Sequence, residues 1–79
     1  MYSSIVYTNT NYGNISCKLK DIMDEKKISI YRLSHDSNIK YEIIKRYYDN
    51  DIQRFDSDIL AKICFCLGCD IGSLLKYEK

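Results

Sequence analysis

The chain has 79 residues, of which 46% are hydrophobic and 29% are charged, and its formal net charge is +1. This length allows one small domain and leaves little room for a deep catalytic cleft. The composition excludes an intrinsically disordered chain, and no apolar run approaches the roughly 20 residues needed to span a bilayer.

Charged residues are distributed unevenly along the chain. Residues 15–46 contain eight Lys and Arg against five Asp and Glu, whereas residues 47–79 contain four against six. The mild basic bias therefore lies in the first half. Residues 1–13 have neither a cationic start nor a long apolar centre, so we expect no export signal and a cytoplasmic protein. The four cysteines should then be reduced.

The first 14 residues differ in composition from the rest. The segment Tyr2–Asn14 is rich in β-branched and aromatic residues and contains no Lys, Arg, Asp or Glu. Such a composition favours an extended conformation. A single strand is not stable alone in water, so the segment is either an arm that pairs with a partner, such as the same arm of a second subunit, or a flexible tail. We divide the chain into an extended arm, 1–14, and a domain, 15–79.

Helical spacing follows the arm. Ser16 can cap a helix that runs to about Lys26. In that helix Leu19, Ile22 and Met23 share one apolar face, and charged side chains cover the rest.

The centre of the chain begins with a short helical segment and a tight turn. Ser29 is the N-cap candidate for a helix from Ile30 to about Asp36, with Leu33 facing inward. Asn38 tolerates the left-handed backbone conformation that ends helices. These features predict a short helix that stops just before residue 39.

A second short helix is predicted over about 40–48. Its inward residues are Ile44 and Tyr47, and Ile39 precedes it as a hydrophobic staple. The run 49–51 then forms a turn. Two short helices on either side of a tight turn suit a protein that lays the second helix in the major groove of DNA.

Two further helices are predicted in the last third. Asp56 or Ser57 caps a helix from Asp58 to Leu67, and Gly68 ends it. Its apolar positions are Ile59, Leu60, Ile63, Cys64 and Leu67. Asp70 caps a final short helix with Ile71, Leu74 and Leu75 facing inward. Five short helices joined by tight turns predict an all-α, compact domain.

The order and spacing of four blocks resemble the Cro/phage-repressor type of helix-turn-helix regulators, the Xre family. LKDIMDEKKIS resembles the first helix and its loop, and YRLSHDSNIK resembles the second helix and the turn. YEIIKRYYDN resembles the recognition helix, and RFDSDILAKICFCLGCDIGSLLKY resembles the last two helices. The resemblance covers residues 15–77. It implies a transcriptional regulator that binds double-stranded DNA, with a recognition helix at about 40–48.

The resemblance also implies roles for individual side chains. Arg46 would contact guanine O6 and N7, Glu42 would accept from a cytosine amino group, and Ile43 would meet a thymine methyl group. Contacts to phosphate position a protein on DNA without reading its sequence. The implied base-reading residues are Tyr41, Glu42, Ile43 and Arg46, and the implied phosphate contacts are Lys40, Lys45, Arg54 and Tyr31.

Three positions depart from the family pattern. Ile30 replaces a polar residue that contacts phosphate and places an apolar group near the DNA-facing edge. Ser34 replaces the usual alanine, and Asn38 replaces the usual turn glycine. Ile30 and the low net charge favour an alternative function on the same fold, a protein-interaction module such as an antitoxin-like or anti-repressor partner.

A homodimer is expected, because one short recognition helix reads few base pairs whereas two related by a dyad read a near-palindrome. The arm, Tyr2–Tyr12, is the candidate contact, and the last helices are the alternative. No membrane partner and no small-molecule ligand are expected.

No residues form a recognisable catalytic motif, since His35 stands alone and no phosphate-cradling glycine loop is present. We therefore predict no enzyme activity and no cofactor. Cys64, Cys66 and Cys69, with Cys17, raise the hypothesis of a metal site. Cys64 and Cys66 would lie about 200° apart on a helix, so they cannot easily share one ion and no bound metal is expected. The resemblance implies that Cys64 and Cys69 are buried as small apolar residues.

Overall fold

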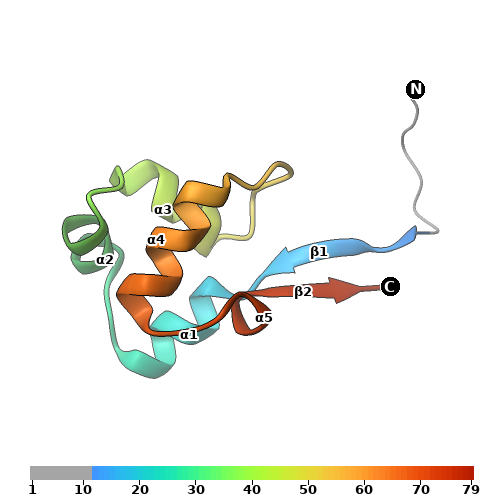
Figure 1. Cartoon of the computed structure of the whole chain (residues 1–79), viewed down its shortest axis with the longest axis horizontal. Coiled ribbons are helices and arrows are strands. Elements are labelled where there is room, and N and C mark those ends of the chain that lie inside the picture. The colour runs from blue at the N-terminus through green and yellow to red at the C-terminus, as the bar shows by residue number, and fades with distance from the viewer. Residues whose placement is uncertain (1–11) are drawn as a thin grey trace.

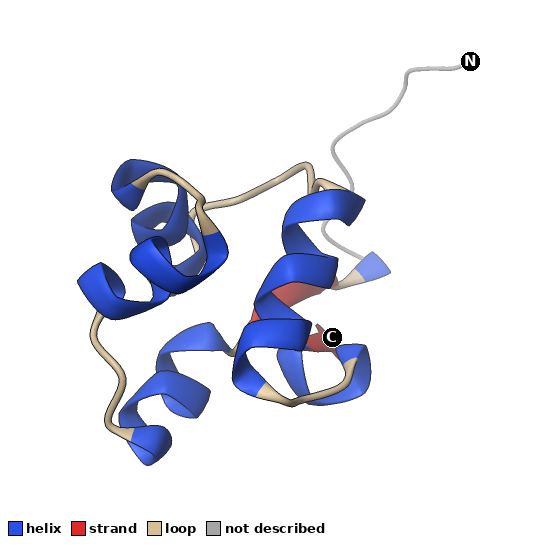
Figure 2. Cartoon of the chain, turned by 60° about the vertical axis from the view of Figure 1, so that its left-hand side comes forward, coloured by secondary structure: helices blue, strands red, loops and turns tan. Residues whose placement is uncertain are grey.

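Five helices and two short strands make up the part of the chain that the computed structural model describes, residues 12–79 (Figure 1). In chain order the elements are β1 (Asn14–Cys17), α1 (Leu19–Lys26), α2 (Ile30–Ser37), α3 (Tyr41–Tyr48), α4 (Ser57–Leu67), α5 (Ile71–Leu74) and β2 (Leu75–Glu78). Helices account for most of the described chain, as Figure 2 shows. The predicted five-helix class with a helix-turn-helix is confirmed, and no helix in residues 12–79 is long and apolar enough to cross a membrane.

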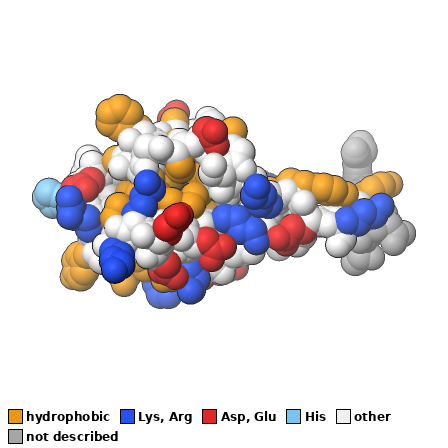
Figure 3. Space-filling view, turned by 90° about the horizontal axis from the view of Figure 1, so that it is seen from below, with side chains coloured by type: hydrophobic (Ala, Val, Ile, Leu, Met, Phe, Trp, Pro, Cys, Tyr) orange, Lys and Arg blue, Asp and Glu red, His pale blue; other side chains and the backbone are white. Residues whose placement is uncertain are grey.

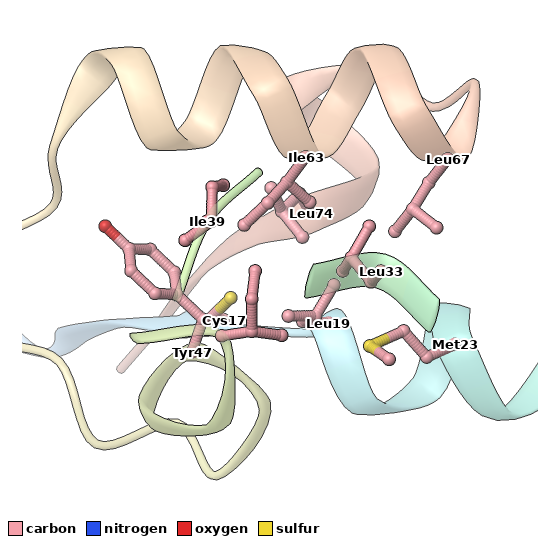
Figure 4. Close-up of a cluster of buried hydrophobic side chains, with 10 residues drawn as sticks. Cys17, Leu19, Met23, Leu33, Ile39, Tyr47, Ile63, Leu67 and Leu74 are labelled. Carbon is pink, nitrogen blue, oxygen red and sulfur yellow. The ribbon is translucent and has the colours of Figure 1, made fainter. Parts of the chain in front are cut away.

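One hydrophobic core holds the helices together, and every helix contributes to it (Figure 4). The inward positions predicted from helical spacing at Leu33, Ile44 and Tyr47 are buried. The inward orientation predicted for Ile71 is wrong: Ile71 is 50% exposed, because α5 is a single turn and only its last residue, Leu74, reaches the core. The buried apolar residues are Cys17, Leu19, Met23, Leu33, Ile39, Ile44, Tyr47, Ile63, Leu67 and Leu74.

The ends of α2 and α4 follow the predicted caps. The Ser29 side chain accepts from the Arg32 N–H at 3.0 Å and begins α2. Asp56 begins α4, and its carboxylate accepts from the N–H groups of the second and third residues of that helix at 2.9 and 3.2 Å. Gly68 ends α4 with φ +65°, and Asn38 ends α2 with φ +59°. The choice left open between Asp56 and Ser57 is therefore resolved in favour of Asp56.

Asp56→Ala should lower the free energy of unfolding by about 1 kcal/mol, because two N–H groups at the start of α4 lose their acceptor. Ser57→Ala is the matched control, since the Ser57 side chain makes no cap bond in the described structure, and it should change stability by less than about 0.5 kcal/mol. Urea unfolding followed by circular dichroism measures both. Equal effects of the two changes would show that Asp56 does not act as the cap.

The strands β1 and β2 form a two-stranded antiparallel ribbon that extends from the helical body and ends at the C-terminus (Figure 1). Asn14 lies opposite Glu78, and Cys17 lies opposite Leu75. The strand at the end of the chain departs from the prediction, which placed Leu75 in the last helix. Residues 1–11 of the predicted arm lie outside the described residues. The last residue of the arm, Asn14, pairs with Glu78 of its own chain.

Ser16 is not the cap of α1, contrary to prediction. It lies in β1 opposite Lys76, and α1 begins at Leu19 without a side-chain cap. The reason is long-range pairing of the backbone. The N–H of Lys18 donates to the carbonyl of Leu74 at 2.7 Å, and the N–H of Cys17 donates to Asn50 Oδ1 at 2.7 Å. These hydrogen bonds hold the residues next to Ser16 in an extended conformation, so Ser16 lies in a strand and does not cap a helix.

Candidate nucleic-acid interface

The turn between α2 and α3 is fixed by local hydrogen bonds and one buried side chain. Ser37 Oγ donates to the Leu33 carbonyl at 2.7 Å and accepts from the Ile39 N–H at 3.3 Å. Ser34 Oγ donates to the Ile39 carbonyl at 2.5 Å. Ile39 itself is buried. Because both backbone groups of Ile39 are bonded to serines of α2, the angle at which the chain enters α3 is held by α2.

The helix α3 has a buried face and an exposed face. Ile44 and Tyr47 lie in the core, and the Tyr47 hydroxyl accepts from the Asp56 N–H at 3.1 Å. The side chains of Glu42, Lys45 and Arg46 are exposed. The core thus fixes the rotation of α3 about its axis, and this rotation presents charged side chains to solvent.

Three of the four predicted base-reading residues share this exposed surface. Tyr41 is 39% exposed, and Glu42 and Arg46 are exposed. Arg46 makes one long contact, from Nη2 to the Asp51 carbonyl at 3.5 Å. Ile43 is half-buried and packs against the core, so the structure does not bring it fully to the same surface.

The predicted phosphate contacts surround this surface. Lys40 stands at the N-cap of α3 and is exposed, and Arg54 is exposed in the loop between α3 and α4. Arg46 and Arg54 line one hollow of about 390 Å³. Lys45 Nζ lies 2.7 Å from Asp49 Oδ2, and this hydrogen bond raises the pKa of the Lys45 amine. The Asp49 carboxylate thus compensates part of the charge of Lys45.

An aromatic pair links the first helix of the motif to the recognition helix. The ring centroids of Tyr31 in α2 and Tyr41 in α3 are 5.4 Å apart, with the planes inclined by 59°. Tilted pairs at this separation attract each other. Sequence reasoning placed both tyrosines in the interface but missed their contact. The ten-residue spacing gives no signal for it until the turn at residues 38–40 folds.

Ile30, which was predicted to lie near the DNA-facing edge, is not fully exposed. Its side chain is half-buried and packs against the core. The side chain of Ile30 points toward the core because it lies one helical turn before the buried Leu33, on the same face of α2. The partial burial of Ile30 reduces the exposed apolar surface that favoured a protein-interaction module.

The remaining polar surface carries mixed charge. Figure 3 shows acidic and basic side chains interspersed over the face seen from below. On α2, Asp36 contacts His35 at 3.4 Å and Arg32 at 3.1 Å, and these two hydrogen bonds lower the pKa of the Asp36 carboxyl. His35 is well exposed. Binding to a polyanion would therefore depend on a few placed cations and not on a broad basic field.

The cysteines occupy apolar positions. Cys17 is buried in the core, whereas Cys64, Cys66 and Cys69 are half-buried, which is less than the burial expected for Cys64 and Cys69. Burial raises the pKa of the Cys17 thiol. Within residues 12–79, no three His, Cys, Asp or Glu side chains gather in a way that could hold a metal ion.

Residues 18–79 match the family described as the Cro/C1-type HTH DNA-binding domain. No curated protein matches the chain. Two solved structures share its fold. A candidate DNA-binding protein from Bacteroides fragilis superposes with a TM-score of 0.69 at 22% identity, over 78% of this chain and 98% of its own. The transcriptional regulator VanUg superposes with a TM-score of 0.68 at 18% identity, over 95% of this chain and 96% of its own. The family match spans the whole helical body, and the chain therefore belongs to the Cro/C1-type helix-turn-helix DNA-binding domains.

Proposed function

We propose that the chain is a small transcriptional regulator that binds double-stranded DNA sequence-specifically, with α3 in the major groove. The observation that carries this proposal is the orientation of α3. Burial of Ile44 and Tyr47 leaves Tyr41, Glu42 and Arg46 together on the opposite, exposed surface. Members of the matched family are DNA-binding domains, and the fold is shared with a transcriptional regulator.

In this proposal the exposed side chains divide into two roles. Arg46 makes a bidentate contact to guanine, Glu42 accepts from a cytosine amino group, and Tyr41 approaches the first base at the start of α3. Ile43 is a minor contributor, because its side chain is half-buried. The phosphate contacts are Lys40, Lys45, Arg54 and Tyr31.

The DNA-binding unit is proposed to be a homodimer. A recognition helix of eight residues, Tyr41–Tyr48, covers only a few base pairs. Two copies related by a dyad would place their α3 helices in successive major grooves, about 34 Å apart, and read a near-palindrome. This arrangement supplies the specificity that one short helix lacks.

Selection of bound duplexes from a random-sequence pool, at low and at moderate salt, tests the proposal. We expect enrichment of a short palindrome. If Lys40, Lys45 and Arg54 each neutralise one phosphate, log K should fall with log salt with a slope of about −2.7 per subunit. An apolar protein interface would respond little to salt. Absence of both enrichment and retention at low salt would refute DNA binding and direct the search to a protein partner.

A further inference from the structure

A groove of about 470 Å³ lies between β1 and the loop that joins α3 to α4. Figure 1 shows that loop on the same side of the molecule as β1. The apolar residues that line the groove are Ile15, Ile52 and Phe55. Asparagine and glutamine side chains also line it, and Asp51 is the single charged residue in its lining. None of the base-reading candidates lines it, but the groove adjoins the hollow lined by Arg46 and Arg54, with which it shares Asp51, Ile52 and Gln53.

The edge of β1 that faces this groove has backbone groups available for pairing. In an antiparallel pair, successive residues point their N–H and C=O groups alternately toward the partner strand and away from it. The Cys17 N–H points away from β2, because it donates to Asn50 Oδ1 at 2.7 Å. Ile15 lies two residues earlier and has the same orientation. Its N–H and C=O therefore point to the open edge, beside the groove.

The ribbon also carries apolar side chains outward from the core. Ile15 and Tyr77 lie opposite each other and are 47% and 61% exposed. They share one face of the ribbon with Cys17 and Leu75, the next pair on that face, which pack on the core. An extended segment laid along β1 would cover Ile15 and gain backbone hydrogen bonds, as in strand addition to a sheet edge.

We propose that this groove receives the N-terminal segment, residues 2–11, of a second copy of the chain, and that the two copies exchange these segments reciprocally. The segment contains no charged residue and is rich in β-branched and aromatic residues, which suits a nearly uncharged groove. Ile5 and Tyr7 are two apart and would share one face of an added strand.

The length of the segment fits this occupant. It joins the described chain at Tyr12, next to the outer end of the ribbon. Ten residues reach roughly 33 Å when extended, whereas covering a four-residue strand needs only about 13 Å. The excess length allows each segment to cross to the other copy. This inference rests on the proposed homodimer and needs no DNA, so its failure is distinguishable from failure of DNA binding.

Sedimentation equilibrium of the full chain, without DNA, tests the exchange. We expect a dimer for the unaltered chain. Ile5→Lys in the segment and Ile15→Glu in the groove should each weaken dimerisation by at least about tenfold, because each places a charge in an apolar contact. Phe65→Lys is the control, since Phe65 is 88% exposed on α4 and lies outside this groove. It should leave the dimer unchanged, and circular dichroism checks that all variants are folded.

Mixing the two weakened variants separates exchange between copies from docking of a segment on its own chain. In a mixed dimer, one unaltered segment meets one unaltered groove, and the altered segment meets the altered groove, where the two introduced charges have opposite sign. The mixture should therefore restore dimers that neither variant forms alone. A monomeric unaltered chain, no restoration on mixing, or dissociation by Phe65→Lys would overturn the proposal, and the last of these would place the interface on α4.

Discussion

Ile44→Ala should lower the free energy of unfolding by about 2–5 kcal/mol. Ile44 is fully buried at the centre of α3 and belongs to the core cluster to which all five helices contribute. The substitution removes three buried carbon atoms and leaves a cavity that the surrounding helices can fill only in part. Domains of this size are stable by roughly 4–12 kcal/mol, so the loss is a large share of the total.

The same substitution should weaken DNA binding indirectly, since Ile44 fixes the rotation of α3 and does not reach the exposed surface. Glu42→Ala is the matched control on the same helix. It should change stability by less than about 0.5 kcal/mol, although we propose that it contacts DNA. Urea unfolding of the two variants measures the difference. A loss below about 1 kcal/mol for Ile44→Ala would show that α3 is not anchored through this side chain.

The helices could be predicted from the sequence because their signals are local. The Ser29 cap, the left-handed Asn38 and the closing Gly68 each act within a few residues of the helix end that they define. Spacing of apolar residues then identified Ile44 and Tyr47 as the buried side of α3.

The ribbon could not be predicted, because its partners lie about 60 residues apart. Ser16 has a side chain suited to a helix cap, and only its pairing opposite Lys76 places it in a strand. Leu75 likewise continues an apolar helical pattern, and its strand conformation depends on Cys17 lying opposite. The hydrogen bond from Cys17 to Asn50 adds a third segment. Local sequence contains no signal for such long-range contacts.

The exposed side of α3 was predicted in outline, and the differences concern two isoleucines that turn toward the core. Ile43 was predicted to read bases and Ile30 to lie near the DNA-facing edge, yet both are half-buried against the core. A large apolar side chain at a boundary position turns toward the core when space is available, because burial is favourable. The Tyr31–Tyr41 contact depends on the geometry of the turn and so could not be read from spacing.

Arg46→Ala should weaken binding to the selected palindrome by about 1–3 kcal/mol and should leave binding to unrelated DNA nearly unchanged. The expectation follows from the freedom of the guanidinium group. Its contact to the Asp51 carbonyl, at 3.5 Å, is at the limit of a hydrogen bond and costs little to break. Arg46 can therefore turn its planar guanidinium group toward a guanine. Removing Arg46 would then lower the affinity only for DNA sites that contain this guanine.

Lys45→Ala should behave differently, although the two residues are neighbours on α3. Lys45 is held by Asp49 at 2.7 Å in an exposed ion pair, and such pairs contribute little to stability. Its point charge suits a phosphate better than a base edge. The change should weaken binding to all sequences about equally and reduce the magnitude of the salt slope by about 1. Lys62→Ala, on the exposed surface of α4, should change neither quantity.

Titration of each variant against the selected site and an unrelated duplex, at several salt concentrations, separates the two roles. A change in the ratio of the two affinities for Arg46→Ala, without one for Lys45→Ala, would assign sequence reading to Arg46. If both variants lost affinity for both duplexes in parallel, Arg46 would also be a phosphate contact. Sequence specificity would then have to come from Tyr41 and Glu42, at the other end of the same exposed surface.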